Sequence, residues 1–322
     1  MGHSRYGTFE EFIGGPWKIH VEKKQRERKL KDSTVYVNNS IIKKYFIPAF
    51  GKRIMNSLTP TDMTIFFDGL KKGKPEQKYL HNVYSLLNSI LKVAADYDWL
   101  QINPLRESLH RPNYTAKEKP TLSTDQVREI INEVPAEYRL LFLIVFCTGV
   151  RIGEAIGFRW LDFDEEERLL SVRNAVWRGA LDTPKSQASV RSLRLVLALV
   201  TMLKQHREQS TFQAGTDFIF ARSDGRAFDP DHLREVVLYP AMDKLNIQRL
   251  PRQHGFHIFR HTAGSLLHQH TGNTKLVQKA LGHAHESTTS DIYVHLQPEI
   301  IADSVEVLAS EILSGLDDGL IN

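Results

Sequence analysis

Four short segments in the second half of the chain carry side chains that could do chemistry. They are TGVRIGEA, TPKSQASVRSL, HIFRH and LGHAHESTTSDIYVH, with the candidate residues Arg151, Glu154, Lys185, His257, Arg260, His283 and Tyr293. Taken singly, each has an ordinary structural explanation, because an Arg and a Glu three residues apart are usually a surface pair on a helix. A lone histidine or tyrosine is likewise usually a packing residue. Any function therefore depends on the four segments acting together.

In combination, these residue types suit attack on a phosphodiester, whose negative charge repels nucleophiles. Arg151 and Arg260 would provide two planar, permanently charged groups that match the geometry of a phosphate. A histidine donor such as His283 can help to stabilise the charge that builds up in the transition state. These three side chains predict a site for a phosphoryl transition state.

The remaining residues of the set could supply the nucleophile and move protons. A tyrosine hydroxyl has a pKa of about 10, so Tyr293 must lose its proton if it attacks phosphorus. His257 could help to remove that proton, although the phosphate itself is another acceptor. Lys185, a flexible cation, could protonate the leaving 5′-oxygen. A phosphotyrosyl ester would keep the energy of the broken bond, so a second 5′-hydroxyl could reverse the attack without ATP, metal or any other cofactor.

The histidines leave a metallohydrolase open as another class of enzyme. His257 and His261 are four residues apart, a spacing that zinc commonly uses on a helix, and His283 and His285 follow. The HIFRH segment, however, lacks the general-base glutamate of the HExxH pattern. Arg260 would also stand beside the metal cation, so we expect no metal site.

Apolar periodicity predicts that the scaffold of these residues, 121–295, is mainly α-helical with one small antiparallel sheet. The expected helices are 124–134, 138–147, a short one after Gly149, 196–209, 230–245, 257–270, 274–281 and 287–293, and the expected strands are 169–178 and 190–196. The segment Tyr138–Cys147 is apolar on all sides and should be buried. Residues 121–295 are therefore interpreted as a catalytic domain.

The tail, 296–322, is predicted to form one amphipathic helix over about 299–313. Ile301, Val305, Leu308 and Ile312 fall on a single stripe of helical spacing, and this stripe must be covered. The stripe could be buried against its own domain or against a neighbouring protomer. Our working hypothesis for the assembly is the neighbouring protomer.

The first part of the chain predicts a separate helical domain over 8–110. It has about four helices, expected at 8–31, 33–45, from 59 or 61 onward, and 78–97, and the proline and glycine of IPAFG should end the second. The polar segment 111–120, RPNYTAKEKP, has a proline at each end and is interpreted as a linker. Residues 1–7 are expected to be disordered or a cloning remnant.

Composition and charge narrow the class of protein. Of 322 residues, 41% are hydrophobic, which is ordinary for a globular protein, and no run approaches the roughly 18 apolar residues of a membrane span. Residues 1–119 hold 21 Lys and Arg against 12 Asp and Glu, whereas 286–322 hold none against 8. A basic first part suits a polyanion such as DNA. With one cysteine and no signal peptide, we expect a protein of the cytoplasm.

Order, spacing and local sequence together resemble the tyrosine recombinase, or phage integrase, family. The resemblance rests on TGVRIGE, on HxxRHT about a hundred residues later, and on LGH followed by a tyrosine ten residues beyond its histidine. It covers the whole of 120–295 and extends more loosely to STVYVNNSIIKKYFIPAFGKRIMNSLTPTDM, which looks like a core-binding domain. It implies a helical, SAM-like core-binding domain and an α-rich catalytic domain with a small antiparallel sheet.

The resemblance also assigns roles. Arg151 and Arg260 would be the two active-site arginines, Lys185 the lysine of the sheet hairpin, His257 and His283 the two histidines, Tyr293 the nucleophile, and Glu154 the acidic residue that supports the first arginine. Cleavage would pass through a 3′-phosphotyrosyl intermediate, for integration or excision of a mobile element.

The resemblance implies double-stranded DNA and further copies of the chain as partners. The two domains would clamp a core site built of inverted repeats. A dimer would bind one site, and a tetramer would form the synapse. An accessory DNA-bending protein would be a further partner. Membrane binding is not expected. Lys78 and Asn82, on the polar side of the last helix of the first domain, are our predicted groove contacts.

Two further hypotheses stay open at this point. A type IB topoisomerase uses a similar arginine, lysine, histidine and tyrosine set, but it would relax one duplex without recombining paired sites. A DNA-binding regulator that has lost catalysis would bind DNA without forming a covalent adduct. The intact set of candidate residues argues against the regulator.

Overall fold

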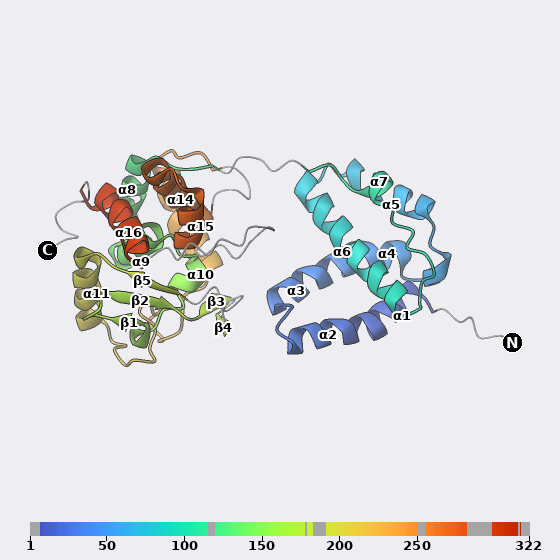
Figure 1. Ribbon diagram of the computed structural model, residues 1–322, viewed down its shortest axis with the longest axis horizontal. Coiled ribbons are helices and arrows are strands. Elements are labelled where there is room, and N and C mark those ends of the chain that lie inside the picture. The colour runs from blue at the N-terminus through green and yellow to red at the C-terminus, as the bar shows by residue number, and fades with distance from the viewer. Residues whose placement is uncertain are drawn as a thin grey trace. The chain divides into compact units, whose positions relative to one another are not determined.

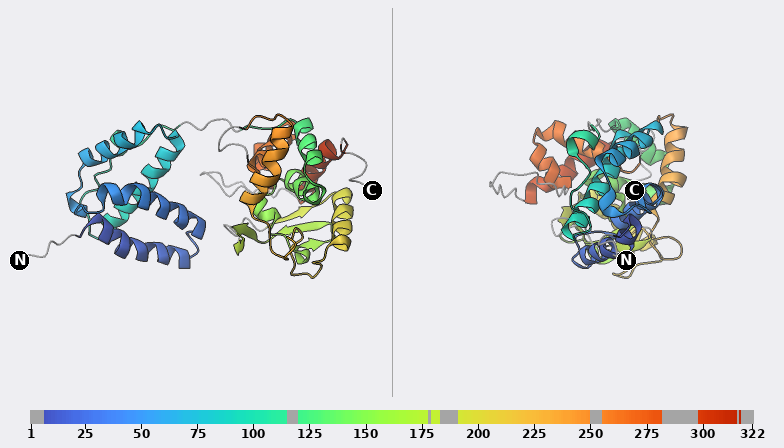
Figure 2. Two further views of the ribbon diagram at one scale, coloured as in Figure 1. Left: turned by 180° about the vertical axis from the view of Figure 1, so that it is seen from behind. Right: turned by 90° about the vertical axis from the view of Figure 1, so that its right-hand side faces the viewer.

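The computed structural model describes residues 7–114, 120–177, 179–182, 191–249, 255–281, 298–314 and 316 (Figures 1 and 2). It contains two compact units, Met1–Lys117 and Glu118–Asn322. Each unit has its own apolar core. The boundary between the units lies inside the segment that the sequence marks as a linker.

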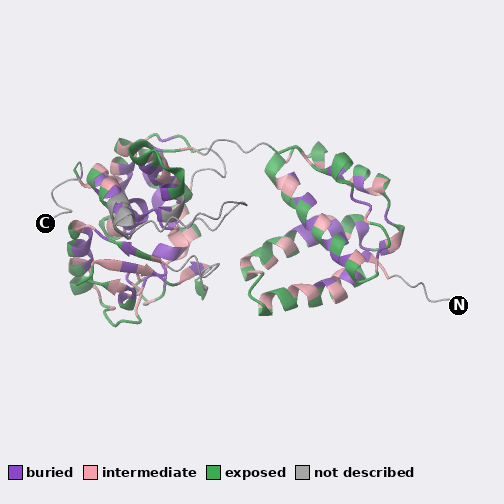
Figure 3. Ribbon diagram, viewed as in Figure 1, coloured by how far each residue is buried: buried purple, intermediate pink, exposed green. Residues whose placement is uncertain are grey.

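The first unit is entirely helical in its described residues. Its elements are α1 (Phe9–Phe12), α2 (Lys18–Arg26), α3 (Asp32–Ile41), α4 (Ile47–Phe50), α5 (Pro60–Lys72), α6 (Gln77–Asp96) and α7 (Glu107–His110), with π-helical turns at Ile13–Trp17 and Ile42–Phe46 and a 3-10 turn at Met55–Ser57. The long helix α6 turns one apolar face to the core, including Val83, Leu87 and Ile90, all fully buried (Figure 3). The predicted fold class of this domain is confirmed.

The helix that was predicted to end at Tyr45 instead continues to Phe50, just before Gly51. Proline lacks the N–H of the helical hydrogen bond, and its ring crowds the carbonyl four residues earlier. The π-helical turn Ile42–Phe46 stands just ahead of Pro48, and Pro16 lies inside the other π-helical turn of this unit. The wider turn accommodates the proline, so the chain stays helical where the sequence pattern predicted a stop.

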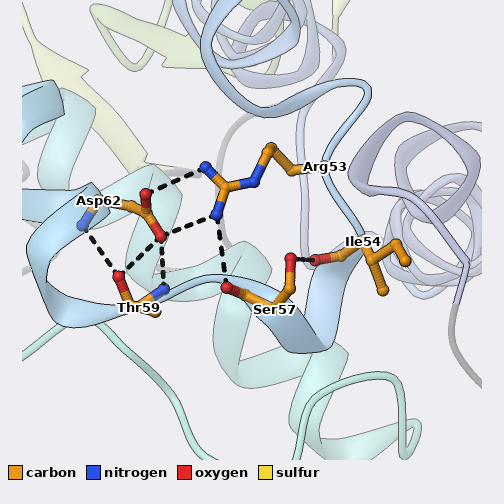
Figure 4. Close-up of polar contacts among 5 residues, drawn as sticks. All are labelled: Arg53, Ile54, Ser57, Thr59 and Asp62. Carbon is orange, nitrogen blue, oxygen red and sulfur yellow. Dashed lines mark hydrogen bonds and ion pairs between the residues drawn. The ribbon is translucent and has the colours of Figure 1, made fainter.

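A polar cluster fixes the start of α5 to the loop before it (Figure 4). Asp62 completes a capping box with Thr59, whose backbone N–H donates to Oδ2 of Asp62 at 2.8 Å. Arg53 donates from Nη1 and Nη2 to the two oxygens of the same carboxylate, at 3.0 and 3.1 Å. The Arg53 guanidinium lowers the pKa of Asp62, so this cluster stabilises the unit at neutral pH and loses its effect as the pH falls through that lowered pKa.

The second unit is mainly helical with two small sheets. Its helices are α8 (Thr124–Glu133), α9 (Ala136–Thr148), α10 (Ile152–Ala155), α11 (Leu197–Gln209), α12 (Pro230–Leu233), α13 (Tyr239–Lys244), α14 (His257–Thr271), α15 (Thr274–Leu281) and α16 (Pro298–Leu313), with a 3-10 turn at Trp160–Asp162 and a π-helical turn at Arg234–Leu238. Helix α9 lies at the centre and contacts α8, α10, α11, α14 and α16. Its residues 141–148 are all buried, as its apolar sequence predicts. In the parts of the chain described, no helix is long and apolar enough to cross a bilayer.

The sheet differs in detail from the predicted pair of strands. Strands β1 (Phe163–Asp164), β2 (Leu169–Val172) and β5 (Arg191–Arg194) form one antiparallel sheet, while β3 (Ala175–Trp177) pairs with β4 (Ala180–Asp182) in a separate hairpin. The single strand predicted over 169–178 is therefore two strands. Strand β3 leaves the first sheet to pack on α10, where a Cβ on Gly153 would lie 2.9 Å from the carbonyl oxygen of Val176.

The tail helix α16 packs on its own domain, which is one of the two covers that the sequence leaves open, and docking on a neighbouring protomer stays a prediction. Val305, Leu308 and Ile312 are at most 3% exposed, and α16 contacts α8, α9, α14, α15 and β5. The side chain of Ile301 lies outside the described residues. A hydrogen bond also joins α8 to α16, since Nε of Arg128 donates to the carbonyl oxygen of Glu311 at 3.1 Å. The predicted apolar stripe is thus covered within the same chain.

We expect Gly149→Ala to destabilise the protein more than Gly272→Ala. Both glycines follow a helix with φ of +62°, so alanine costs each about 1–2 kcal/mol for the left-handed conformation. At Gly149 the new Cβ would also lie 2.3 Å from Cδ2 of Leu281, whereas at Gly272 it would meet nothing within 4 Å. Overpacking adds about 1–3 kcal/mol. Urea denaturation of the two variants measures the difference, and equal losses would contradict the packing argument.

Candidate active site

Three elements of the second unit bring candidate residues together. The chain leaves α9 at Gly149 in a left-handed turn, and Arg151 follows as the N-cap residue of α10. The first turn of α14 supplies His257 and Arg260, and the start of β5 supplies an arginine that the sequence analysis did not single out, Arg191. The site is therefore built where two helices begin and one strand begins.

Glu154 is the residue that organises the first arginine. Its Oε1 accepts a hydrogen bond from Nη1 of Arg151 at 2.9 Å, and its Oε2 accepts one from the backbone N–H of Arg151 at 3.0 Å. Oε2 also accepts from Nη2 of Arg191 at 3.0 Å. Burial raises the pKa of Glu154, but the nearby arginines and the backbone hydrogen bond bring it below its usual value. Glu154 is thus a charged carboxylate with an arginine on each oxygen.

Arg260 is almost completely enclosed, with 4% of its surface exposed. Its Nη1 donates to the carbonyl oxygen of Gly149 at 2.5 Å, and its Nη2 donates to the carbonyl oxygen of Leu281. Burial lowers the pKa of Arg260 to about 9, with a further contribution from Arg151. It therefore remains a cation at neutral pH, held in one orientation by the ends of α9 and α15.

The four charged residues form one electrostatic group. Arg151, Arg191 and Glu154 all influence the pKa of Arg260, the arginines lowering it and the carboxylate raising it. Three guanidiniums and one carboxylate leave a net charge of +2, and the side chain of Arg151 is 39% exposed, whereas that of Glu154 is 8% exposed. Such a group suits an anionic ligand with two or more oxygens, as a phosphodiester has.

His257 lies one helical turn before Arg260 and is exposed at the start of α14. Its ring stacks on that of His261, with 6.4 Å between the ring centroids. Within the described ranges, no group of three His, Cys, Asp or Glu side chains is arranged to hold a metal ion. His257 thus stays an exposed residue in the first turn of α14, and its role in proton transfer stays a prediction.

The other predicted residues divide into two groups. Lys185, His283 and Tyr293 lie outside the described residues, and their places in the site stay predictions. Lys78 and Asn82 lie in the first unit, both exposed on the side of α6 that is turned away from its core. Arg191 was missed although it stands in the quoted segment TPKSQASVRSL. The sequence offered one indication of its role: Arg191 stands at the start of a predicted strand, close to the turn that contains Lys185.

Comparison with known proteins agrees with this geometry. Residues 120–299 match the model of the phage integrase family, a range that includes all seven candidate residues from Arg151 to Tyr293. Residues 17–71 match the N-terminal SAM-like domain of phage integrases, a range that ends before Lys78. A tyrosine recombinase XerC-like protein of Caldanaerobacter subterraneus subsp. tengcongensis is 27% identical over 274 residues, covering 76% of this chain and 68% of the relative.

Solved structures share the fold at low sequence identity. A Tn1549 transposon integrase in complex with a circular intermediate DNA superposes with a TM-score of 0.71 at 19% identity, covering 91% of this chain and 98% of that one. A lambda integrase tetramer bound to a Holliday junction gives a TM-score of 0.64 at 16% identity, covering 89% and 80%. With more than half of its length matched by the family model, this chain belongs to the phage integrase family.

Proposed function

We propose that this chain is a site-specific DNA recombinase that cleaves and rejoins strands through a 3′-phosphotyrosyl intermediate, for integration or excision of a mobile element. The observation that carries the proposal is the pairing of Arg151 with Arg260 in a cationic group, within a range that matches the phage integrase family throughout. A similar integrase acts for a transposon, and its structure contains a circular intermediate DNA.

The proposed reaction conserves the number of ester bonds. The hydroxyl oxygen of Tyr293 attacks phosphorus as its proton passes to His257 or to the phosphate, the bond from phosphorus to the 5′-oxygen breaks, and Lys185 gives the leaving oxygen a proton. Arg151 and Arg260 stabilise the additional negative charge on the phosphoryl oxygens. A 5′-hydroxyl of another strand then attacks the phosphotyrosyl ester and releases Tyr293.

The first unit is proposed to hold the DNA. Its sequence is rich in lysine and arginine, and the exposed side of α6 carries Lys78 and Asn82 together with Ser85, Ser89 and Lys92. A polar helical face of this width fits the major groove of a duplex. Two protomers would bind the inverted repeats of one core site, and two such dimers would form the synapse, as the tetrameric state of the lambda integrase complex supports.

We expect Lys78→Ala to weaken DNA binding and to reduce its dependence on salt. Loss of one phosphate contact lowers the slope of log affinity against log salt concentration by about 1. A fluorescence titration of a labelled duplex at several salt concentrations measures both quantities. The control is Lys204→Ala, which removes a lysine on α11 that forms an ion pair with Glu165. Equal affinities and slopes for the parent and Lys78→Ala would rule out the contact.

The function is tested by trapping the covalent intermediate. The parent protein is incubated with a pool of duplexes that carry one nick, with randomised sequence on both sides of it. Cleavage next to the nick releases a short strand, so religation fails and the adduct accumulates. Recovery of a denaturation-resistant adduct, followed by mapping of the modified residue to Tyr293, supports the proposal. No adduct with any sequence in the pool would contradict it.

The trapped duplexes also separate recombination from relaxation. The enriched sequence is cloned once or twice into a supercoiled plasmid and incubated with the parent protein. A recombinase exchanges the two copies and yields products that depend on both sites. A topoisomerase relaxes the one-site and two-site plasmids equally, without exchange.

A further inference from the structure

Arg191 makes contacts that the proposed mechanism does not use. It is the first residue of β5, and its Nη2 donates to Oε2 of Glu154 at 3.0 Å. Its side chain is 13% exposed, whereas that of Arg151, on the same carboxylate, is 39% exposed. Arg151 is thus the more accessible of the two to an anionic substrate, and Arg191 is the one enclosed by protein.

The backbone around Arg191 is fixed by the sheet. Arg191 pairs with Val172 in the register between β5 and β2, and the next inward residue, Leu193, is 1% exposed. Arg151 and Glu154 belong to α10 instead. The ion pair between Arg191 and Glu154 therefore joins the sheet to the helix that carries the first active-site arginine.

The charges explain why a second arginine is needed. A buried carboxylate that had Arg151 as its only cationic partner would cancel much of the charge with which Arg151 attracts a phosphate. Arg191 provides a second cation for the same carboxylate. Arg151 can then hold its hydrogen bond to Glu154 and still present positive charge to the substrate.

We propose that Arg191 is a positioning residue: by binding the Glu154 carboxylate, it fixes the Arg151 guanidinium for the scissile phosphate and keeps its charge available. This inference rests on the proposed function, since it assigns a role within the same site. Arg191 itself is not proposed to touch the DNA.

The first test measures single-turnover cleavage of the trapped nicked duplex. Arg191→Gln is expected to cleave roughly 10–100-fold more slowly, the loss typical when a residue that orients an active-site group is removed. Arg191→Lys keeps the charge and should recover part of that loss. The matched control is Arg194→Gln, on the same strand but exposed. It is expected to cleave like the parent.

The second test is the pH profile of cleavage. Among the residues that the structure describes, the charged groups that face Glu154 are Arg151 on α10, Arg191 on β5 and Arg260 on α14. Without Arg191, burial has more influence on Glu154, so its pKa rises and it takes up a proton at a higher pH than in the parent. The acid limb of the cleavage profile should therefore move to higher pH in Arg191→Gln. It should stay in place in Arg194→Gln.

A double-variant cycle decides whether Arg191 acts through Glu154. In a Glu154→Gln chain there is no carboxylate to hold, so adding Arg191→Gln should cost little further activity and should shift no acid limb. A full additional loss in that background, or an unshifted acid limb in Arg191→Gln, would overturn the proposal. If the parent itself forms no adduct, the proposed function fails first, which this series distinguishes from a failure of Arg191 alone.

Folding is checked by circular dichroism and by retention of duplex binding. If Arg191→Gln does not fold, Arg191→Lys decides the question, because it retains the charge but replaces the guanidinium. A smaller shift of its acid limb in the same direction supports the role of Arg191. A profile identical to the parent's, at the parent's rate, contradicts it.

Discussion

Tyr293→Phe is expected to bind the duplex as tightly as the parent and to form no covalent adduct. The substitution removes only the phenolic oxygen, so the ring and the DNA contacts elsewhere are kept. Without that oxygen there is no nucleophile, and the loss should be complete within detection. Denaturing electrophoresis of the nicked duplex after incubation, beside a binding titration of the same preparation, measures the two effects.

The matched control for this result is Tyr138→Phe. Tyr138 lies in the same unit on α9, its ring contacts that of Phe228, and burial raises the pKa of its hydroxyl, which disfavours the reactive phenolate. This variant should form the adduct like the parent. An adduct in Tyr293→Phe, mapped to any other residue, would show that the nucleophile has been assigned wrongly.

Arg260→Ala is expected to reduce the rate of cleavage roughly 100–1000-fold, the effect of removing one donor to a developing negative charge. The guanidinium is held in one orientation by the carbonyl oxygens of Gly149 and Leu281, an orientation that alanine cannot reproduce. Single-turnover cleavage of the trapped duplex measures the loss. Arg260→Lys should also be slow, because one ammonium cannot bind both carbonyls and a phosphate in the same geometry.

Arg139→Ala separates this catalytic effect from the loss of a structural arginine. Arg139 lies near the other end of α9 and, like Arg260, donates to two backbone carbonyls, those of Val134 and Asn132, at 3.1 and 2.8 Å. Its removal should lower the free energy of unfolding but leave the cleavage rate of the folded protein unchanged. Equal losses of cleavage in the two variants would mean that Arg260 acts through stability alone.

Local patterns were enough to predict the described helices of the second unit, while the predicted helix 287–293 lies outside the described residues. The apolar sequence of α9 correctly indicated a buried central helix, and Gly149 indicated the turn that leads to Arg151. The structure brings Arg151, Glu154 and Arg260 into one charged group, and their catalytic roles stay predictions. The helix α9 and the turn at Gly149 could be predicted because each depends on residues within a few positions of one another.

The errors concern partners far apart in the chain. The place of Arg191 depends on the pairing of β5 with β2 and on the approach of α10, neither of which leaves a local pattern. The apolar stripe of α16 was recognised, but a stripe does not say which surface covers it. Helix α4 was missed for a different reason, since a π-helical turn offsets the effect of Pro48.

The packing of α16 limits how far Tyr293, the proposed nucleophile, can lie from the domain. Helices α15 and α16 contact each other and the same core, and between them runs the segment 282–297. Tyr293 is five residues from Pro298, so a fully stretched backbone places its Cα at most about 18 Å from that of Pro298. A strand end esterified to Tyr293 would be connected to this domain through the backbone on both sides of Tyr293. The cleaved strand end could then rotate, or join a different strand, only within the distance that the chain from Tyr293 to Pro298 can span.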